Sequence, residues 1–284
     1  MGKSLSGPDN LRDMHTPEQV RQRLEDGTPQ SYLKDMVYGG IDGTITTFAV
    51  VSGVVGADLA AGIVVILGLA NLIADGFSMA VSNFLGTKAE QQFLQKIRVE
   101  EELEVKLIPE GEREEIRQIY AAKGFEGELL EQVVDVITSN EQVWIDTMLL
   151  EEHGLLLDGP EPKRAAWWTF VAFLIAGIVP VIPFILNLVI DGGIPSPFLW
   201  SSIATAATFF GIGIYKARVV GGNTVKAGFE TVTVGGMAAV LAYGVGWLLR
   251  GVGQRVLHSG RPECHNFTRW ARHRPPASSG WRRR

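Results

Sequence analysis

The sequence predicts an all-α membrane protein with five transmembrane helices and a soluble helical domain inserted between the second and the third. Five separate apolar segments occur in a chain of 284 residues, 46% of which are hydrophobic. Each has roughly the 20 residues that a helix needs to cross a hydrocarbon layer of about 30 Å. In addition, residues 86–164 hold nine Lys or Arg and nineteen Asp or Glu, a net charge of −10. A soluble bundle with buried helices is the alternative, but five segments of this length disfavour it.

The chain begins with a predicted N-terminal cytosolic segment, residues 1–33. Within it, "TPEQVRQRLEDG" predicts a short amphipathic helix, with Thr16 as its N-cap, Pro17 in its first turn and Gly27 after its end. The first 20 residues lack a continuous apolar core, so we expect no cleavable signal peptide.

Five segments have the length and composition of membrane spans. In chain order they are Met36–Val55, Leu59–Phe84, Ala165–Ile190, Phe198–Tyr215 and Gly228–Leu249. We therefore assign spans 1 and 2 to residues 34–85, the soluble domain to 86–163, and spans 3 to 5 to 164–250. Basic residues flank one set of span ends: Lys34, Lys163, Arg164, Lys216, Arg218 and Lys226. The positive-inside rule accordingly places the N-terminus and the acidic domain in the cytosol.

The last segment, residues 251–284, has a basic composition unlike the rest of the chain, and we expect it to be disordered.

The soluble domain, by contrast, has helical patterns throughout. Residues 87–107 can continue the second span without a break, and three more helices are expected within residues 109–124, 126–140 and 141–154. The expected result is a small acidic bundle attached to a membrane domain.

Polar residues interrupt the first two spans. Asp42 lies about six residues into the first span, where a carboxylate is costly unless it meets water, a partner or a cation. An interfacial Asp that caps the helix is the alternative. Asn71, Asp75 and Met79 are spaced i, i+4, i+8 and therefore share one face of the second span. Carboxylate oxygen together with thioether sulfur favours a borderline metal such as Fe²⁺ over Mg²⁺ or Ca²⁺.

Eight glutamates occur between Glu100 and Ile116, and several pairs have helical spacing. Glu101 with Glu104, and Glu112 with Glu115, are i, i+3 pairs, while Met148 and Glu152 form an i, i+4 pair. These pairs could converge on shared cations. Spacing does not select them, however, because Glu100 with Glu104 and Glu110 with Glu114 fit equally well. A solvated acidic surface is the alternative interpretation.

The chain resembles the vacuolar iron transporter family over about residues 34–250. The motifs that carry the resemblance are "GGIDGTITTFAVVSGV", "GLANLIADGFSMA", "WIDTMLLEEHGL", "PKRAAWWTFVAFLIAGIVPVIPF" and "YKARVVGGN". The resemblance implies a dimer of five-span chains that exports cytosolic Fe²⁺, and often Mn²⁺ or similar ions, in exchange for protons. Asp42 and Met79 would line the path at the dimer interface. The implied ligands of a cytosolic metal-binding domain are Glu101, Glu104, Glu112, Glu115, Met148 and Glu152.

Two departures from the family pattern bear on mechanism. This chain has Asn71 where plant members carry a Glu, and Leu149 where they carry a second Met. Asp75, one turn beyond Asn71, is the expected replacement for the missing titratable group. If it does not take that role, the protein would couple weakly to protons or act as a uniporter. Leu149 leaves the cytosolic site with one thioether, which should weaken its preference for soft metals.

Other function classes fit the sequence less well. A ferritin-like di-iron enzyme needs Glu-x-x-His, but Leu150 precedes His153 at i−3. A membrane-anchored metal sensor does not require polar residues inside the bilayer. The acidic charge opposes a nucleic-acid partner. The sequence shows no Gly-rich phosphate-binding loop to support ATP-driven pumping, and no nucleophile–base pair of the hydrolase kind. We expect no cofactor beyond the transported metal, and a multi-pass protein of the plasma membrane in a prokaryote or the vacuolar membrane in a eukaryote.

Overall fold

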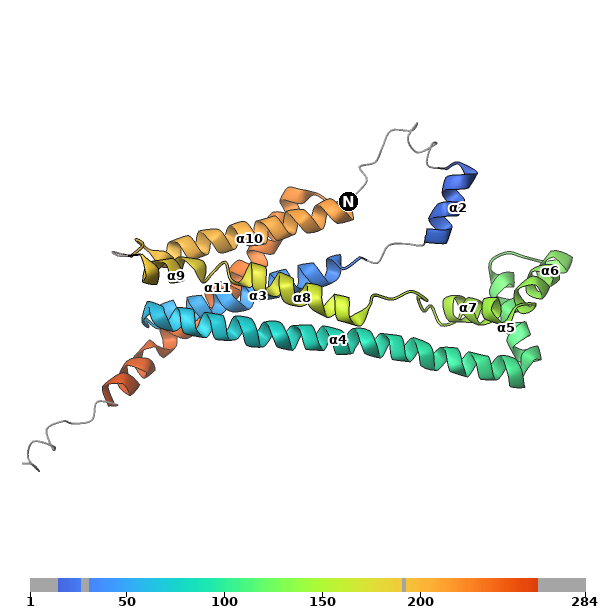
Figure 1. The fold of residues 1–284 in the computed structure, drawn as a ribbon, viewed down its shortest axis with the longest axis horizontal. Helices are drawn as coiled ribbons and strands as arrows, with labels where there is room; N and C mark the ends of the chain where they lie inside the picture. Colours follow the sequence, from blue (N-terminus) through green and yellow to red (C-terminus); the bar gives the residue numbers. More distant parts are fainter. Residues whose placement is uncertain (1–14, 27–30, 191–192, 260–284) are drawn as a thin grey trace, which may run out of the picture.

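The computed structural model describes residues 15–26, 31–190 and 193–259, with side chains as far as residue 251, and these ranges contain helices and no strand (Figure 1). The helices, in chain order, are α2 Pro17–Asp26, α3 Leu33–Gly56, α4 Ala61–Leu107, α5 Pro109–Ala122, α6 Gly127–Thr138, α7 Glu141–Glu151, α8 Pro162–Gly177, α9 Ile182–Val189, α10 Pro197–Val220 and α11 Thr224–Ser259. The predicted all-α class is thus confirmed for the described part of the chain.

Four helices are long and apolar enough to cross a membrane: α3, α4, α10 and residues 224–251 of α11. The pair α8 and α9 also qualifies if it is counted as one span, although the two helices are bent by 52°. The predicted third span, Ala165–Ile190, therefore corresponds to two helices joined by a bend. The helical pattern stops between Gly177 and Ile182, around Pro180, which has no N–H to donate to the preceding turn.

Helix α3 lies inside the membrane-type bundle and contacts α4, α8, α10 and α11. Its glycines permit the close approach of α8. A Cβ atom on Gly39 would lie 2.3 Å from the carbonyl oxygen of Thr169, and one on Gly43 would lie 2.5 Å from that of Phe173. The glycines around Asp42 therefore allow close helix packing, as small residues do in membrane bundles.

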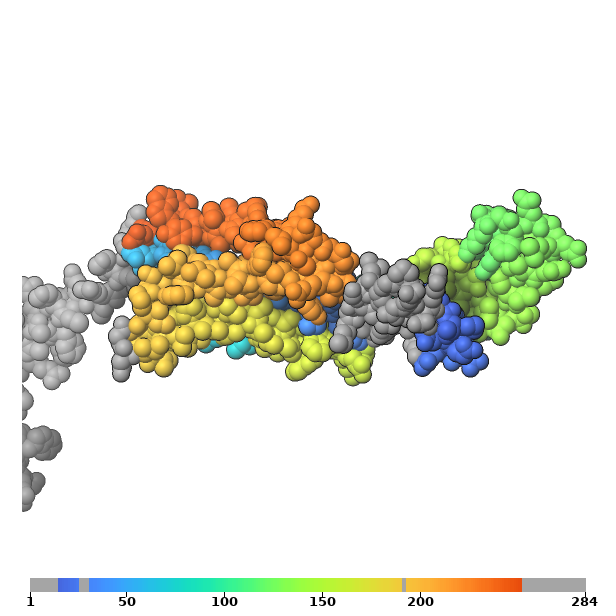
Figure 2. All heavy atoms as spheres, turned by 90° about the horizontal axis from the view of Figure 1, so that it is seen from above, coloured from blue at the N-terminus to red at the C-terminus, as the bar shows by residue number. Residues whose placement is uncertain are grey.

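Helix α4 is continuous over 47 residues, so the helix of the second predicted span does continue without a break through residues 87–107. Its first part contacts α3 and α8, and its far end contacts α5 and α7 (Figure 1). We call the second part of α4 (residues 87–107) together with α5, α6 and α7 the acidic bundle. Seen from a second direction, α5 and α6 (green) lie at the opposite end of the molecule from α9 (Figure 2).

The acidic bundle has its own apolar core. The buried members are Val105, Ile116, Leu130, Val134, Ile137, Trp144, Ile145, Met148 and Leu149. The core holds α5, α6 and α7 against α4 and so fixes which faces of these helices turn inward.

The two ends of the chain are described in part. Thr16 caps α2 as expected, because its Oγ1 accepts a hydrogen bond from the N–H of Gln19 at 3.4 Å. Helix α11 continues to Ser259, beyond residue 250 where we expected the last span to end. Most of the predicted basic tail, residues 260–284, lies outside the described residues, as do residues 1–14.

Candidate metal sites

Glutamates from α4 and α5 meet inside the acidic bundle. The chain turns at Ile108, between the end of α4 and Pro109, the first residue of α5. Carboxylate oxygens of Glu101, Glu104 and Glu112 consequently lie within 4.8 Å of one another. This separation is short enough for one cation to bind all three.

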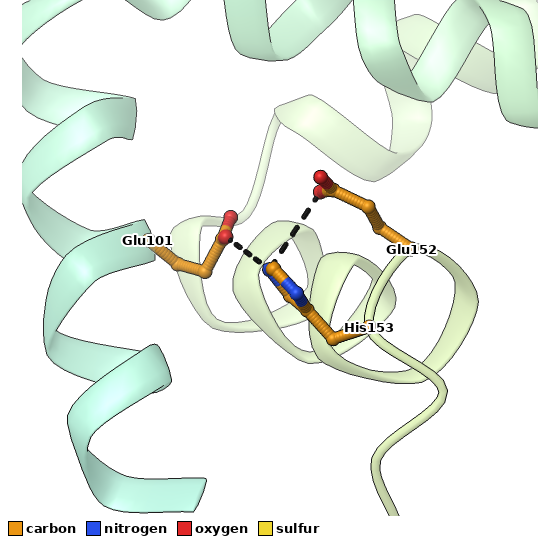
Figure 3. Close-up of side chains that lie close together, drawn as sticks. All are labelled: Glu101, Glu152 and His153. Carbon is orange, nitrogen blue, oxygen red and sulfur yellow. Dashed lines mark hydrogen bonds and ion pairs between the residues drawn. The ribbon is translucent and has the colours of Figure 1, made fainter. Parts of the chain in front are cut away.

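A second group adds a nitrogen atom from the end of α7. Nε2 of His153 lies 2.8 Å from Oε1 of Glu101 and 3.8 Å from Oε2 of Glu152 (Figure 3). Since Glu101 belongs to both groups, they form one continuous set. With the neighbouring Glu115, we call these residues the carboxylate cluster: Glu101, Glu104, Glu112, Glu115, Glu152 and His153.

Two carboxylates of the cluster are buried and incompletely bonded. Glu101 is 3% exposed and Glu112 is 2% exposed. Oε2 of each is enclosed and has no hydrogen-bond partner among the described residues. A buried carboxylate without a partner is costly, and a bound cation would remove that cost.

The electrostatics of the cluster agree with a shortage of positive charge. Burial raises the pKa of Glu112 to about 7, and repulsion from Glu115 and Glu101 adds to the effect. Burial also raises the pKa of Glu101 and that of Glu115 above their ordinary values, and repulsion from Glu152 contributes to both. The hydrogen bond to Glu101 raises the pKa of His153.

The basic side chains between residues 100 and 117 form ion pairs outside the carboxylate cluster. Arg113 pairs with Asp135 on α6, and Lys106 pairs with Glu141 on α7. Arg117 pairs with Glu131 and Glu114, on the outside of α5. None of these cations has an ion pair with a carboxylate of the cluster among the described residues, so they leave its charge uncompensated.

The implied metal-binding domain also includes two apolar positions on α7. Met148 and Leu149 are both fully buried in the apolar core of the acidic bundle. Met148 lies one helical turn before Glu152 on α7. His153, which the sequence interpretation considered only as part of a di-iron motif, joins the cluster directly. Its position immediately after Glu152, at the end of α7, was the available signal.

Within the membrane-type helices, polar residues of α3 and α4 face each other. Asp42 on α3 and Asp75 on α4 lie near enough for their charges to repel. Asn71, Asp75 and Met79 are all half-buried, as expected for one helix face. The amide nitrogen of Asn71 is buried and has no hydrogen-bond partner among the described residues.

The same polar face continues to residues that the sequence interpretation missed. Met79 lines a cavity of about 260 Å³ together with Asp35, Asn83 and Thr169. Nδ2 of Asn83 donates to Oδ1 of Asp35 at 2.8 Å. Asn83 is four residues after Met79, and Asp35 is seven before Asp42. Helical spacing therefore places each on the same helix face as its predicted neighbour, and could have identified both from the sequence.

Comparisons with known proteins match most of the chain. A family model described as the VIT family matches residues 33–247. The vacuolar iron transporter of Toxoplasma gondii is 36% identical over 230 residues, which cover 78% of this chain and 76% of the relative. The vacuolar iron transporter of Plasmodium falciparum is 30% identical, with 77% of this chain and 82% of the relative covered. Vacuolar iron transporter 1 of Arabidopsis thaliana is 29% identical, with 82% and 89% covered. The resemblance in the motifs is thereby confirmed, and the chain belongs to the vacuolar iron transporter (VIT) family.

Proposed function

We propose that this protein transports divalent iron out of the cytosol in exchange for protons. Membership of the VIT family supports metal transport in general. The observation that carries the specific proposal is the pair Asp42 and Asp75, two carboxylates on adjoining helices of the membrane-type bundle. Neither has an ion pair among the described residues. Charge at such depth is costly and is typical of an ion pathway.

The path runs along the polar face of α4. The cavity beside Asp35 and Met79 is its cytosolic mouth, because it lies at the end of the bundle nearer the acidic bundle. From there the ion passes Asp75 and Asp42 and then Asn71. Carboxylate and thioether groups in sequence suit Fe²⁺, and Mn²⁺ is a second substrate because carboxylates also suit that ion.

The carboxylate cluster collects metal before transport. Glu101 is about 33 Å from Met79 along α4, at 1.5 Å of rise per residue, so an ion bound at one cannot touch the other. The cluster therefore raises the local concentration of metal near the mouth and does not hand ions over directly. The net charge of −10 in residues 86–164 supports this role by attracting cations.

Proton exchange follows from competition for one carboxylate. An ionised carboxylate accepts a metal ion, whereas a protonated one does not bind it well. Asp75 takes the place of the Glu that plant members carry at the position of Asn71. A proton that binds Asp75 or Asp42 from the far side releases the metal there, and loss of that proton to the cytosol resets the site.

A second copy of the chain completes the pathway. The polar face of α4 is half-buried in the single chain, and α4 also carries exposed apolar side chains. These are Ile66, Leu67, Ile73, Phe77, Val81 and Leu85. A homodimer would enclose this face, with lipid covering the other helices. The membrane is the plasma membrane if the host is a prokaryote and the vacuolar membrane if it is a eukaryote.

The direct test is Fe²⁺ flux into proteoliposomes with an imposed pH gradient. The intact protein should move Fe²⁺, and the gradient should accelerate the flux. Asp42→Ala should abolish it, while Asp158→Ala, which removes an exposed carboxylate from the loop before α8, should not. If the folded, inserted protein binds metal but no gradient produces flux, the transporter proposal fails and the sensor interpretation replaces it.

A further inference from the structure

The carboxylate cluster contains one nitrogen donor that the family-derived set of ligands omits. His153 lies at the junction of α7 and the following loop, where Gly154 adopts a left-handed backbone with φ +64°. The N–H groups of Glu152 and His153 both bond to the carbonyl oxygen of Met148, at 3.0 and 3.3 Å. These backbone bonds hold the side chains of Glu152 and His153 beside Glu101 of α4 (Figure 3).

The spacing of the atoms matches that of ligands around a small cation. Nε2 of His153 is 2.8 Å from Oε1 of Glu101 and 3.8 Å from Oε2 of Glu152. Ligands about 2.1 Å from a transition metal are separated by about 3.0 to 3.4 Å in octahedral or tetrahedral geometry. The observed separations lie on either side of that range. If the ligand atoms moved by a few tenths of an ångström, a metal ion could take the place of the hydrogen bond between His153 and Glu101.

Buried oxygen atoms without partners support a ligand site over a merely acidic surface. Oε2 of Glu101 and Oε2 of Glu112 are enclosed without partners, on side chains more than nine-tenths buried. The side chain of His153 is 30% exposed, so an ion can reach it from solvent.

We propose that His153 is a metal ligand of the carboxylate cluster and makes the cluster selective for nitrogen-preferring transition metals over Mn²⁺, Mg²⁺ and Ca²⁺. Imidazole suits Fe²⁺, Co²⁺ and Zn²⁺, whereas a set of carboxylates alone suits the harder ions. His153 thereby supplies a donor softer than the carboxylate oxygens of the cluster. This inference rests on the proposed metal-collecting role of the cluster.

The test compares metal binding by full-length variants in detergent micelles. Affinities for Zn²⁺ and Mn²⁺ come from competition with a chelating dye, and Co²⁺ binding is followed by visible absorption. His153→Leu should weaken Zn²⁺ binding by about tenfold or more and shift the Co²⁺ spectrum, with a much smaller change for Mn²⁺. His153→Gln, which retains a hydrogen-bonding group for Glu101, should behave like His153→Leu. His15→Leu is the control for an imidazole elsewhere in the chain.

The outcomes separate this inference from the proposed function. If Glu101→Gln abolishes binding but His153→Leu leaves the Zn²⁺ affinity and the Co²⁺ spectrum unchanged, His153 is not a ligand although the cluster binds metal. If the unaltered protein binds neither Zn²⁺ nor Mn²⁺, both the inference and the metal-collecting role fail. Elution of every variant as the same species in size exclusion shows that folding is intact.

Discussion

The side-chain amide of Asn83 joins three helices at the cytosolic mouth of the proposed path. Its Nδ2 donates to Oδ1 of Asp35 on α3 at 2.8 Å and to Oγ1 of Thr169 on α8 at 2.7 Å. Asp35 is only 7% exposed. Asn83 is therefore the side-chain donor to a buried carboxylate, and it connects α4 to the two helices on which it packs.

Replacing Asn83 should destabilise the protein through Asp35. Asn83→Leu keeps a similar volume but removes the donor, and it should lower the free energy of unfolding by about 1–3 kcal/mol. Adding Asp35→Leu should recover part of the loss, because replacing both partners removes the unsatisfied carboxylate. Ser82→Ala, at a residue that lines the same cavity, is the control. Unfolding in detergent measures each variant, and equal stabilities of Asn83→Leu and Ser82→Ala would contradict the argument.

The metal-free protein should lose stability as the pH rises through the titration of Glu112. The pKa of Glu112 is about 7 in the folded protein against an ordinary value of 4.5, because burial disfavours the ionised form. Its contribution is therefore fully present below pH 4.5 and is lost as the pH rises through about 7. Glu101 and Glu115, whose pKa values are also raised, act in the same direction.

Thermal unfolding between pH 5 and 8.5, with a chelator present, tests this dependence. Glu112→Gln should flatten the curve because a neutral amide does not titrate, while Glu128→Gln, at an exposed residue of α6, should leave it unchanged. Added divalent metal should stabilise the intact protein more at pH 8 than at pH 6, since ionised carboxylates bind it best. A metal-free protein that becomes more stable as the pH rises would rule out this account of the cluster.

Asp75 should link the flux of Fe²⁺ to the proton gradient. Asp75→Asn removes the titratable group but retains an oxygen ligand, so it should leave a slower downhill flux of Fe²⁺ that no longer responds to an imposed pH gradient. Proteoliposome flux at equal and unequal pH measures the response. Asn71→Glu combined with Asp75→Asn moves the carboxylate back one turn and should restore part of the coupling. If the Fe²⁺ flux of Asp75→Asn alone still responds fully to the pH gradient, another residue carries the exchanged proton.

Close packing of α3 against α8 should depend on Gly43. A Cβ atom at this position would lie 2.5 Å from the carbonyl oxygen of Phe173, so Gly43→Ala must push the two helices apart. We expect a loss of about 1–3 kcal/mol in stability, as for other overpacked sites. Gly62→Ala, on α4, places its methyl group in open space and should be neutral or slightly stabilising. Equal stabilities of Gly43→Ala and Gly62→Ala would show that the bundle tolerates a larger distance between α3 and α8.

Helix type and extent were largely predictable from the sequence because they depend on local composition and period. The apolar segments predicted α3, α4, α10 and most of α11, and the continuous pattern after Phe84 predicted the long α4. The bend between α8 and α9 was less predictable. Pro180 signals a weak point, but whether the chain continues straight or turns depends on what packs on either side of it.

The sequence alone determined that carboxylates lie within the apolar spans, that an acidic helical segment separates two of them, and that the family is that of the vacuolar iron transporters. It could not determine which glutamates face inward, because the i, i+3 and i, i+4 pairs define the faces of one helix without showing which face meets a neighbour. Only the tertiary structure decided this. Packing of α5 and α7 against α4 turned Glu101 and Glu112 inward and left Glu100 to pair with Lys96 and Glu114 with Arg117 on the surface. The same packing brought His153 to Glu101, 52 residues away in the chain, a contact that no local periodicity encodes.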